Sequence, residues 1–144
     1  MTEPLKLVAT LFEFPPSANR LYIRTRRVGT ILSKEARKFK ADALIQLTKE
    51  WLFSAKPGRD EAYRLTLQFY FPKIETSGWP KKAKSRFVKR DVSNLIKVLE
   101  DVIAQATGVD DSNTLEVCVF KRVDKANPRI EITFENIPEE EWKS

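Results

Sequence analysis

The chain has 144 residues, 42% of them hydrophobic and 32% charged, which is the balance of one globular domain and excludes a disordered chain. It carries 26 lysines and arginines against 20 acidic residues, and this net charge of +6 favours a polyanionic partner. It has no histidine and one cysteine, Cys118, which excludes imidazole catalysis, an intrachain disulfide and the common zinc sites. Hydrolytic chemistry would therefore depend on carboxylates, lysines, hydroxyls and an oxygen-liganded metal.

The N-terminal half predicts a strand, a basic segment and a helix. Residues 5–14 are rich in β-forming residues and run into two prolines, so they predict a strand that enters a rigid turn. We interpret residues 17–32 as a loop with some extended character. Ser33 is a suitable N-cap for a helix that runs to about Phe53, because apolar residues recur at every fourth position after it.

The middle of the chain predicts a strand, a long loop and a second helix. Residues 62–72 alternate apolar and polar side chains, which is the period of a half-buried strand. Residues 73–90 are polar and have no sustained periodicity, so they predict a long, mobile loop. Residues 91–106 place their apolar side chains on one helical face, and Gly108 ends that helix.

The C-terminal part predicts two strands and a short tail. Residues 114–123 and 129–134 predict a hairpin across the turn at 124–128, with Cys118 facing the core. Residues 137–144 are acidic and predict a frayed end. We expect one α+β domain over residues 1–144, in which a small mixed or antiparallel sheet packs with two main helices.

Positive charge is concentrated in two segments. Residues 20–40 and 73–97 together carry a net charge of +13, whereas the rest of the chain carries −7. Such segregation suits binding to a phosphate backbone, and the aromatic residues within both segments could stack on exposed bases. The alternative is a pair of solvated surface loops. The basic residues that we expect to contact DNA are Arg20, Arg24, Arg26, Arg27, Lys81, Lys82, Lys84, Arg86, Lys89 and Arg90.

Candidate metal-binding carboxylates lie at both ends of the second predicted helix. Asp91 precedes the helix, and Asp110 and Asp111 follow it, roughly 24 Å away along the axis of a 16-residue helix. A shared site therefore requires the chain after Gly108 to fold back, or a partner subunit to supply one half. Each residue also has a structural alternative: Asp91 as a helix cap, and Asp110 and Asp111 as part of an ordinary turn over residues 110–113. Lys97 could equally be a surface lysine.

Three motifs in sequence order are similar to a known family. The segments PPSANRLY, KRDVSNLIKVLEDVI and GVDDSNTLEV resemble the RusA family of Holliday junction resolvases, most strongly from Arg90 to about Val119. The resemblance implies a RusA-like fold and a homodimer that cuts four-way DNA junctions with Mg²⁺, or with Mn²⁺ in its place, in recombination and repair. It also implies a cytoplasmic location in a bacterial or phage-infected cell.

The resemblance assigns roles to individual residues. Asp91 matches the first aspartate of the family motif, Lys97 its lysine and Asp111 the second residue of a later aspartate pair. It implies that Asp91 and Asp111 bind the metal, with Asp110 able to supply a further ligand, and that Lys97 stabilises the transition state. Ser93 stands where the family often has an aspartate.

Two other functions stay open at the level of the sequence. The first is a catalytically weak or inactive junction-binding protein of the same fold, because a serine at position 93 removes one negative charge from the metal site. The second is a small scaffold protein whose basic loops bind an acidic protein. No apolar run approaches the ~20 residues that span a bilayer, and the N-terminus lacks the features of a signal peptide, so we expect no membrane partner.

Overall fold

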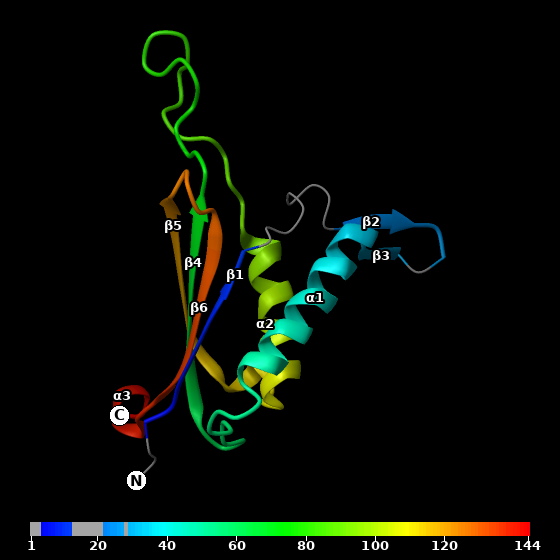
Figure 1. Cartoon of the computed structure of the whole chain (residues 1–144), viewed down its shortest axis with the longest axis vertical. Helices are drawn as coiled ribbons and strands as arrows, with labels where there is room; N and C mark the ends of the chain where they lie inside the picture. The colour runs from blue at the N-terminus through cyan, green and yellow to red at the C-terminus, as the bar shows by residue number, and fades with distance from the viewer. Residues whose placement is uncertain (1–3, 13–21, 28) are drawn as a thin grey trace.

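The computed structural model describes residues 4–12, 22–27 and 29–144. A mixed four-stranded sheet forms one layer, in the spatial order β1-β6-β4-β5 (Figure 1). Its central strand β4 buries alternate side chains along its whole length, as the apolar alternation of its sequence requires. The strands are β1 (Lys6–Leu11), β4 (Ala62–Phe71), β5 (Thr114–Val123) and β6 (Arg129–Ile137).

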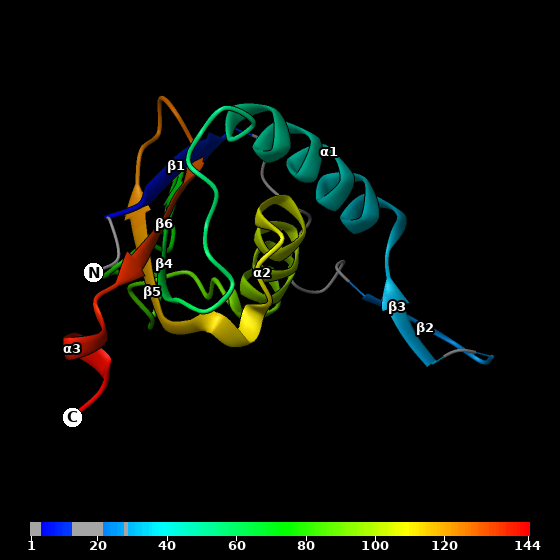
Figure 2. The same ribbon diagram turned by 90° about the horizontal axis from the view of Figure 1, so that it is seen from below.

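Two helices cover one face of this sheet (Figure 2). Helix α1 (Lys34–Glu50) begins at Ser33, whose hydroxyl accepts a hydrogen bond from the Ala36 amide at 3.2 Å, so the predicted N-cap is confirmed. Helix α2 (Ser93–Thr107) turns its apolar face to the sheet and to α1. The core lies between these layers and includes Leu47, Tyr63, Leu65, Leu67, Phe69, Leu99, Val102, Ile132 and Phe134.

The predicted hairpin at residues 114–134 is wrong. Strand β4 lies between β5 and β6; it pairs in parallel with β5 and antiparallel with β6. The reason is the helix between β4 and β5, since a strand, helix and strand in succession form a crossover that returns the second strand parallel to the first. The turn after β5 therefore passes the end of β4, where the Asp124 amide donates to the Phe71 carbonyl at 2.9 Å.

Cys118 does not face the core as predicted. It lies opposite Thr66 in the register of β4 and β5, on the sheet face away from the helices, and it is half-buried. The neighbouring residues Val117 and Val119 lie opposite the buried Leu65 and Leu67, so they occupy the face that the helices cover. Both faces of β5 carry apolar residues, so the alternation of the sequence did not show which set of alternate residues faces the core.

The segment predicted as a loop before α1 forms a hairpin in its described part. Strands β2 (Tyr22–Thr25) and β3 (Gly29–Leu32) pair antiparallel, and Figure 2 shows them beyond the start of α1, away from the sheet. Gly29 has a φ of 76°, a conformation that glycine adopts without strain. The β-branched and aromatic residues on either side of the turn favour this pairing.

Three element boundaries differ from the predictions by a few residues. The first strand ends at Leu11, α1 ends at Glu50, and α2 begins two residues after Asp91. The tail forms a short helix, α3 (Glu139–Trp142), in place of a frayed end, and Glu141 lies 3.6 Å from Arg64. The α+β class with a mixed sheet and two main helices is confirmed. Within the described part of the chain, no helix is long and apolar enough to span a bilayer.

Candidate functional site

The start of α2 holds the side chain of Asp91 in a defined position. Its Oδ1 accepts a hydrogen bond from the Ser93 amide at 3.0 Å, and the Ser93 hydroxyl also donates to this carboxylate. These two bonds lower the pKa of Asp91, and the nearby charges of Lys121 and Lys89 lower it further. Asp91 therefore remains an exposed, ionised carboxylate at neutral pH, although Val92 is the residue in the N-cap position.

The chain reverses direction directly after α2. Gly108 has a φ of 74°, and its amide donates to the Ala104 carbonyl at 2.9 Å, which is a left-handed helix end. The next residue, Val109, is buried in the core and fixes the path of the chain after the turn. Because of these two residues, the acidic segment that follows lies against α2 and does not continue its axis.

The acidic segment itself forms a short 3-10 helix, η2 (Asp111–Asn113). Asp110 caps this turn, since its Oδ1 accepts a hydrogen bond from the Ser112 amide at 2.8 Å. The Asn113 side chain donates to the backbone carbonyls of Arg59 and Glu61, at 2.6 and 2.8 Å. The structural interpretation of Asp110 as a turn residue is therefore supported, and the turn holds the neighbouring Asp111 in place.

Asp111 approaches the middle of α2 at Glu100. The pKa of Glu100 is raised, first by partial burial and then by the negative charges of Asp111 and Asp101, while Lys97 lowers it. Lys97, Glu100 and Asp111 are thus close enough for their charges to interact, and we call them the carboxylate–lysine cluster. Asp101 faces α1 instead, where it lies 3.5 Å from Lys40.

Glu100 is the member of this cluster that the sequence did not single out. The signal was present, because Glu100 follows Lys97 by three residues and side chains at that spacing are neighbours on a helix surface. What the sequence could not show is that the chain after Gly108 brings Asp111 to the same surface. No basic side chain within the described residues forms an ion pair with Asp111 or with Glu100.

The donor atoms of this cluster fit a hard divalent cation. Mg²⁺ typically binds one or two protein carboxylates and keeps water or phosphate oxygens in its other positions. Glu100 and Asp111 supply two carboxylates whose mutual repulsion a cation would relieve. Over residues 4–12, 22–27 and 29–144, however, no three acidic or cysteine side chains gather in a geometry that could hold a metal.

The three predicted metal ligands are therefore only partly brought together. Asp110 and Asp111 adjoin each other, but Asp91 lies before the first residue of α2, a helix about 22 Å long. Asp111 reaches back to the level of Glu100, about two turns from the start of the helix. A metal site within one subunit requires the chain to fold back after Gly108. The chain does fold back there, but it does not reach Asp91.

Residues 73–90, which we call the basic arm, extend beyond the end of the sheet (Figure 1). The base of the arm is paired: the Thr76 amide donates to the Arg86 carbonyl at 2.7 Å, and the Val88 amide to the Ile74 carbonyl at 2.8 Å. The arm thus has local structure where the sequence predicted none. Lys81, Lys82 and Lys84 are exposed in the outer part of the arm, and Lys89 is exposed at its base. Trp79 and Phe87 are exposed aromatic residues of the arm.

Two arginines of the arm have partners within the protein. Arg90 is half-buried, lies 5.3 Å from the Phe71 ring centroid and donates to the Lys73 carbonyl at 3.3 Å. Arg86 forms an ion pair with Glu75 at 3.2 Å. Both side chains help to hold the arm in place, and their contact with DNA stays a prediction.

The second basic segment lies on the β2–β3 hairpin. Arg24, Arg26 and Arg27 are exposed there, whereas Arg20 lies outside the described residues. Figure 1 shows that the hairpin and the basic arm leave the body at the end of the molecule where α2 begins. Two regions that are about fifty residues apart in the sequence thus present positive charge at the same end of the fold.

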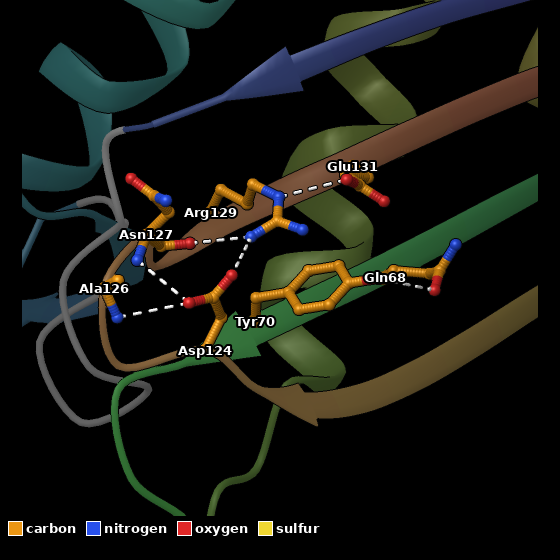
Figure 3. A network of polar contacts seen from close by, with 7 residues as sticks. All are labelled: Gln68, Tyr70, Asp124, Ala126, Asn127, Arg129 and Glu131. Carbon is orange, nitrogen blue, oxygen red and sulfur yellow. Dashed lines mark hydrogen bonds and ion pairs between the residues drawn. The ribbon is translucent and has the colours of Figure 1, made fainter.

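A second polar network lies in the turn after β5 (Figure 3). Unlike the carboxylate–lysine cluster, it pairs its carboxylates with a guanidinium group. Asp124 accepts hydrogen bonds from the Ala126 and Asn127 amides, both at 3.1 Å, and from the Arg129 guanidinium at 2.7 Å. Arg129 also donates to Glu131 at 3.0 Å and lies 3.9 Å from the centroid of the Tyr70 ring. Both carboxylate oxygens of Asp124 have partners, so this network stabilises a turn and is not a candidate site.

The chain matches a family model described as endodeoxyribonuclease RusA over residues 13–135. The match covers most of the chain and includes α2, the carboxylate–lysine cluster and the basic arm. No curated protein matches the chain.

Proposed function

This chain belongs to the RusA endodeoxyribonuclease family, and from that premise we propose that it is a divalent-metal-dependent nuclease that resolves four-way DNA junctions as a homodimer. Membership of the family implies endonuclease activity on Holliday junctions. The structural observation that carries the proposal is the carboxylate–lysine cluster, in which Asp111 of η2 lies close to Lys97 and Glu100 of α2. The cellular role would be recombination and repair in the cytoplasm of a bacterial or phage-infected cell.

The carboxylates supply the metal ligands in this proposal. Asp111 and Glu100 would hold Mg²⁺ or Mn²⁺, with Asp110 adjacent. Asp91 lies about two helical turns away and would contribute a ligand through a partner subunit. A bound divalent ion polarises the scissile phosphate and lowers the pKa of an attacking water. The protein itself keeps Asp91 ionised through the Ser93 bonds and keeps Asp111 in place through the η2 turn.

Lys97 acts on the phosphate in this proposal. Its exposed ammonium group lies one helical turn before Glu100, so a phosphate bound at the two carboxylates would be within reach of it. A cation in that position stabilises the negative charge that develops on the phosphate oxygens in the transition state. Its role is thus distinct from that of the carboxylates, which bind the metal.

The basic arm and the β2–β3 hairpin would bind the arms of the junction. Their exposed lysines and arginines neutralise phosphates, so binding should weaken steeply as salt is added. A four-way junction has two equivalent strands to cut, and a two-fold symmetric dimer presents two equivalent sites. Both basic regions lie at the end of the fold where α2 begins, which would place DNA beside the start of this helix.

The alternative function is a junction-binding protein with little or no cleavage activity, and Ser93 is the observation that favours it. The Ser93 hydroxyl donates to Asp91 and supplies no negative charge of its own. In our proposal this hydroxyl positions Asp91, so Ser93→Ala should lower cleavage by only about three- to tenfold. If the alternative holds, the wild type binds the junction without cutting it, and Ser93→Asp gains activity.

Cleavage of an end-labelled synthetic four-way junction, with and without Mg²⁺ and beside a linear duplex of the same sequence, tests the proposal. We expect paired, metal-dependent nicks in the junction and none in the duplex. Tight junction binding without any cutting would contradict the nuclease and support the alternative. Equal cutting of the duplex would contradict selectivity for junctions.

A further inference from the structure

Strand β5 leaves one edge of the sheet open. It is ten residues long, and within the described part of the chain β4 is the strand that pairs with it, on one side only. Figure 1 shows β5 at the outer edge of the sheet. An open edge of this length presents unpaired backbone amides and carbonyls that can pair with another strand.

The side chains of β5 are unusually apolar for a free edge. Leu115 is 50% exposed, Val117 41%, Phe120 38% and Val123 50%, and these residues are spread over both faces of the strand. The strand contains no proline, the residue that often protects an edge from pairing. The opposite edge strand, β1, has only six residues.

The sequence of β5 is complementary to itself. In an antiparallel pair with a two-fold axis at Val119, Glu116 lies opposite Arg122 of the second copy, and Leu115 lies opposite Val123. Glu116 also forms an ion pair with Arg64 of its own chain, and Val117 lies opposite Lys121. Opposite charges and apolar residues placed directly across from each other stabilise a strand pair. We propose that β5 pairs with β5 of a second copy of this chain, in this register, and joins the two sheets into one.

Other registers fit less well. Moving one β5 strand by a single residue relative to the other is excluded, because side chains from opposite faces of the sheet would then lie across from each other. A shift by two residues in one direction places Glu116 opposite Asp124, two like charges. The same shift in the other direction places Glu116 opposite Phe120, so the charge of Glu116 has no partner across the interface. The register centred on Val119 is thus the one that pairs charge with opposite charge.

This inference rests on the proposed function, which includes a homodimer. It adds which surface of the chain forms the dimer. Strand β5 begins directly after Asn113 of the η2 turn, so the interface adjoins the candidate site. Lys121 near the other end of β5 donates to the Arg90 carbonyl, next to Asp91. A partner strand along this edge would therefore reach the surroundings of both ends of α2.

The first test is the mass of the protein in solution. The wild type should sediment at twice the 16.7 kDa of one chain. Arg122→Glu places like charges opposite each other twice in the dimer, so we expect its dissociation constant to rise at least about tenfold. Lys6→Glu makes the same charge change on the exposed surface of the other edge strand and should leave the dimer intact. Circular dichroism should give the wild-type spectrum for both variants, which checks that they are folded.

The second test reports the register. Phe120→Cys places a cysteine opposite the native Cys118 of the second copy, at the separation of directly paired residues, which a disulfide can bridge. Mild oxidation should convert this variant into a covalent dimer. Arg122→Cys, on the same face but opposite Glu116, should not form one.

The outcomes separate the two proposals. A wild type that sediments as a monomer at all concentrations contradicts both the homodimer and this interface. A dimer that persists unchanged in Arg122→Glu, or that cross-links equally in both cysteine variants, contradicts the interface alone. Cleavage of a four-way junction by the wild type is measured separately and does not depend on which surface forms the dimer.

Discussion

The turns at the two ends of β5 use the same kind of residue for different purposes. Before the strand, Asp111 adjoins Asp110, lies close enough to Glu100 for their charges to interact, and forms no ion pair with a basic side chain of the described residues. After the strand, Asp124 accepts hydrogen bonds from two backbone amides and from the Arg129 guanidinium. One carboxylate is therefore next to another negative charge, and the other is fully compensated.

This difference indicates which carboxylate is available for a ligand. A carboxylate that already accepts three hydrogen bonds and pairs with a guanidinium gains little from a cation, and its loss disturbs the fold. A carboxylate beside a second one gains from a cation, because the ion removes their repulsion. Two short acidic turns in one chain thus separate into a candidate metal site and a structural network.

The largest expected effect on cleavage comes from replacing Asp111 by asparagine, and the same replacement at Asp124 is its control. Asp111→Asn removes a proposed metal ligand, so cleavage of a four-way junction should fall at least about 100-fold, while junction binding and Tm stay near those of the wild type. Asp124→Asn should retain cleavage in the folded protein and lower Tm. Gel-based cleavage, binding and thermal melting of both variants measure this. Cleavage that survives in Asp111→Asn would remove this residue from the site.

Lys97→Ala should have the next largest effect. If Lys97 stabilises charge on the phosphate, its loss should slow single-turnover cleavage by about 10- to 100-fold, with little change in junction affinity. Lys125→Ala is the matched control, because Lys125 is an exposed lysine in the turn after β5. Equal rates for the two variants would make Lys97 an ordinary surface lysine.

Glu100→Gln tests the residue that the sequence did not single out. The change keeps the shape of the side chain and removes its charge, so the Mg²⁺ concentration for half-maximal cleavage should rise about tenfold. Cleavage at saturating Mg²⁺ should change less. A titration with Mg²⁺ at fixed junction concentration measures both quantities, and an unchanged midpoint would exclude Glu100 as a ligand.

Arg129→Ala should change stability and leave the chemistry intact. The hydrogen bond from Arg129 is the main cause that lowers the pKa of Asp124 from its ordinary value of 3.8. The ionised carboxylate therefore stabilises the folded state above pH 3.8, and this stabilisation is lost as the pH falls through the lowered pKa of Asp124. The Tm of the variant should therefore lie below that of the wild type at neutral pH, and the gap should narrow below pH 3.8. Melting curves across this range measure it, and a gap independent of pH would contradict the assignment.

Local signals in the sequence predicted most elements of the fold. Ser33 fixed the start of α1, the apolar alternation of residues 62–71 gave β4, and the apolar face of residues 95–103 gave α2. The pairing of strands could not be predicted in the same way, because β5 and β6 are neighbours in sequence but lie on opposite sides of β4. Strand order depends on the crossover through α2, and strand patterns alone do not contain it.

The candidate site was predictable in its residues but not in its arrangement. Asp91, Lys97 and Asp111 were recognisable from motifs, whereas the approach of Asp111 to Glu100 depends on the left-handed turn at Gly108 and the burial of Val109. Each of these features is local, yet their combined effect on the direction of the chain is a tertiary property. The same holds for Arg90, which the charge pattern assigned to DNA and which also packs against Phe71.

Binding of Mn²⁺, followed by NMR, tests most directly the claim that the two turns differ in function. Mn²⁺ is paramagnetic, so it broadens the amide resonances of residues close to its binding site. We predict selective broadening around Lys97, Glu100 and Asp111 at low Mn²⁺ concentration, with the resonances of residues 124–131 unchanged. Broadening centred on Asp124, or uniform broadening without preference for either turn, would contradict the account.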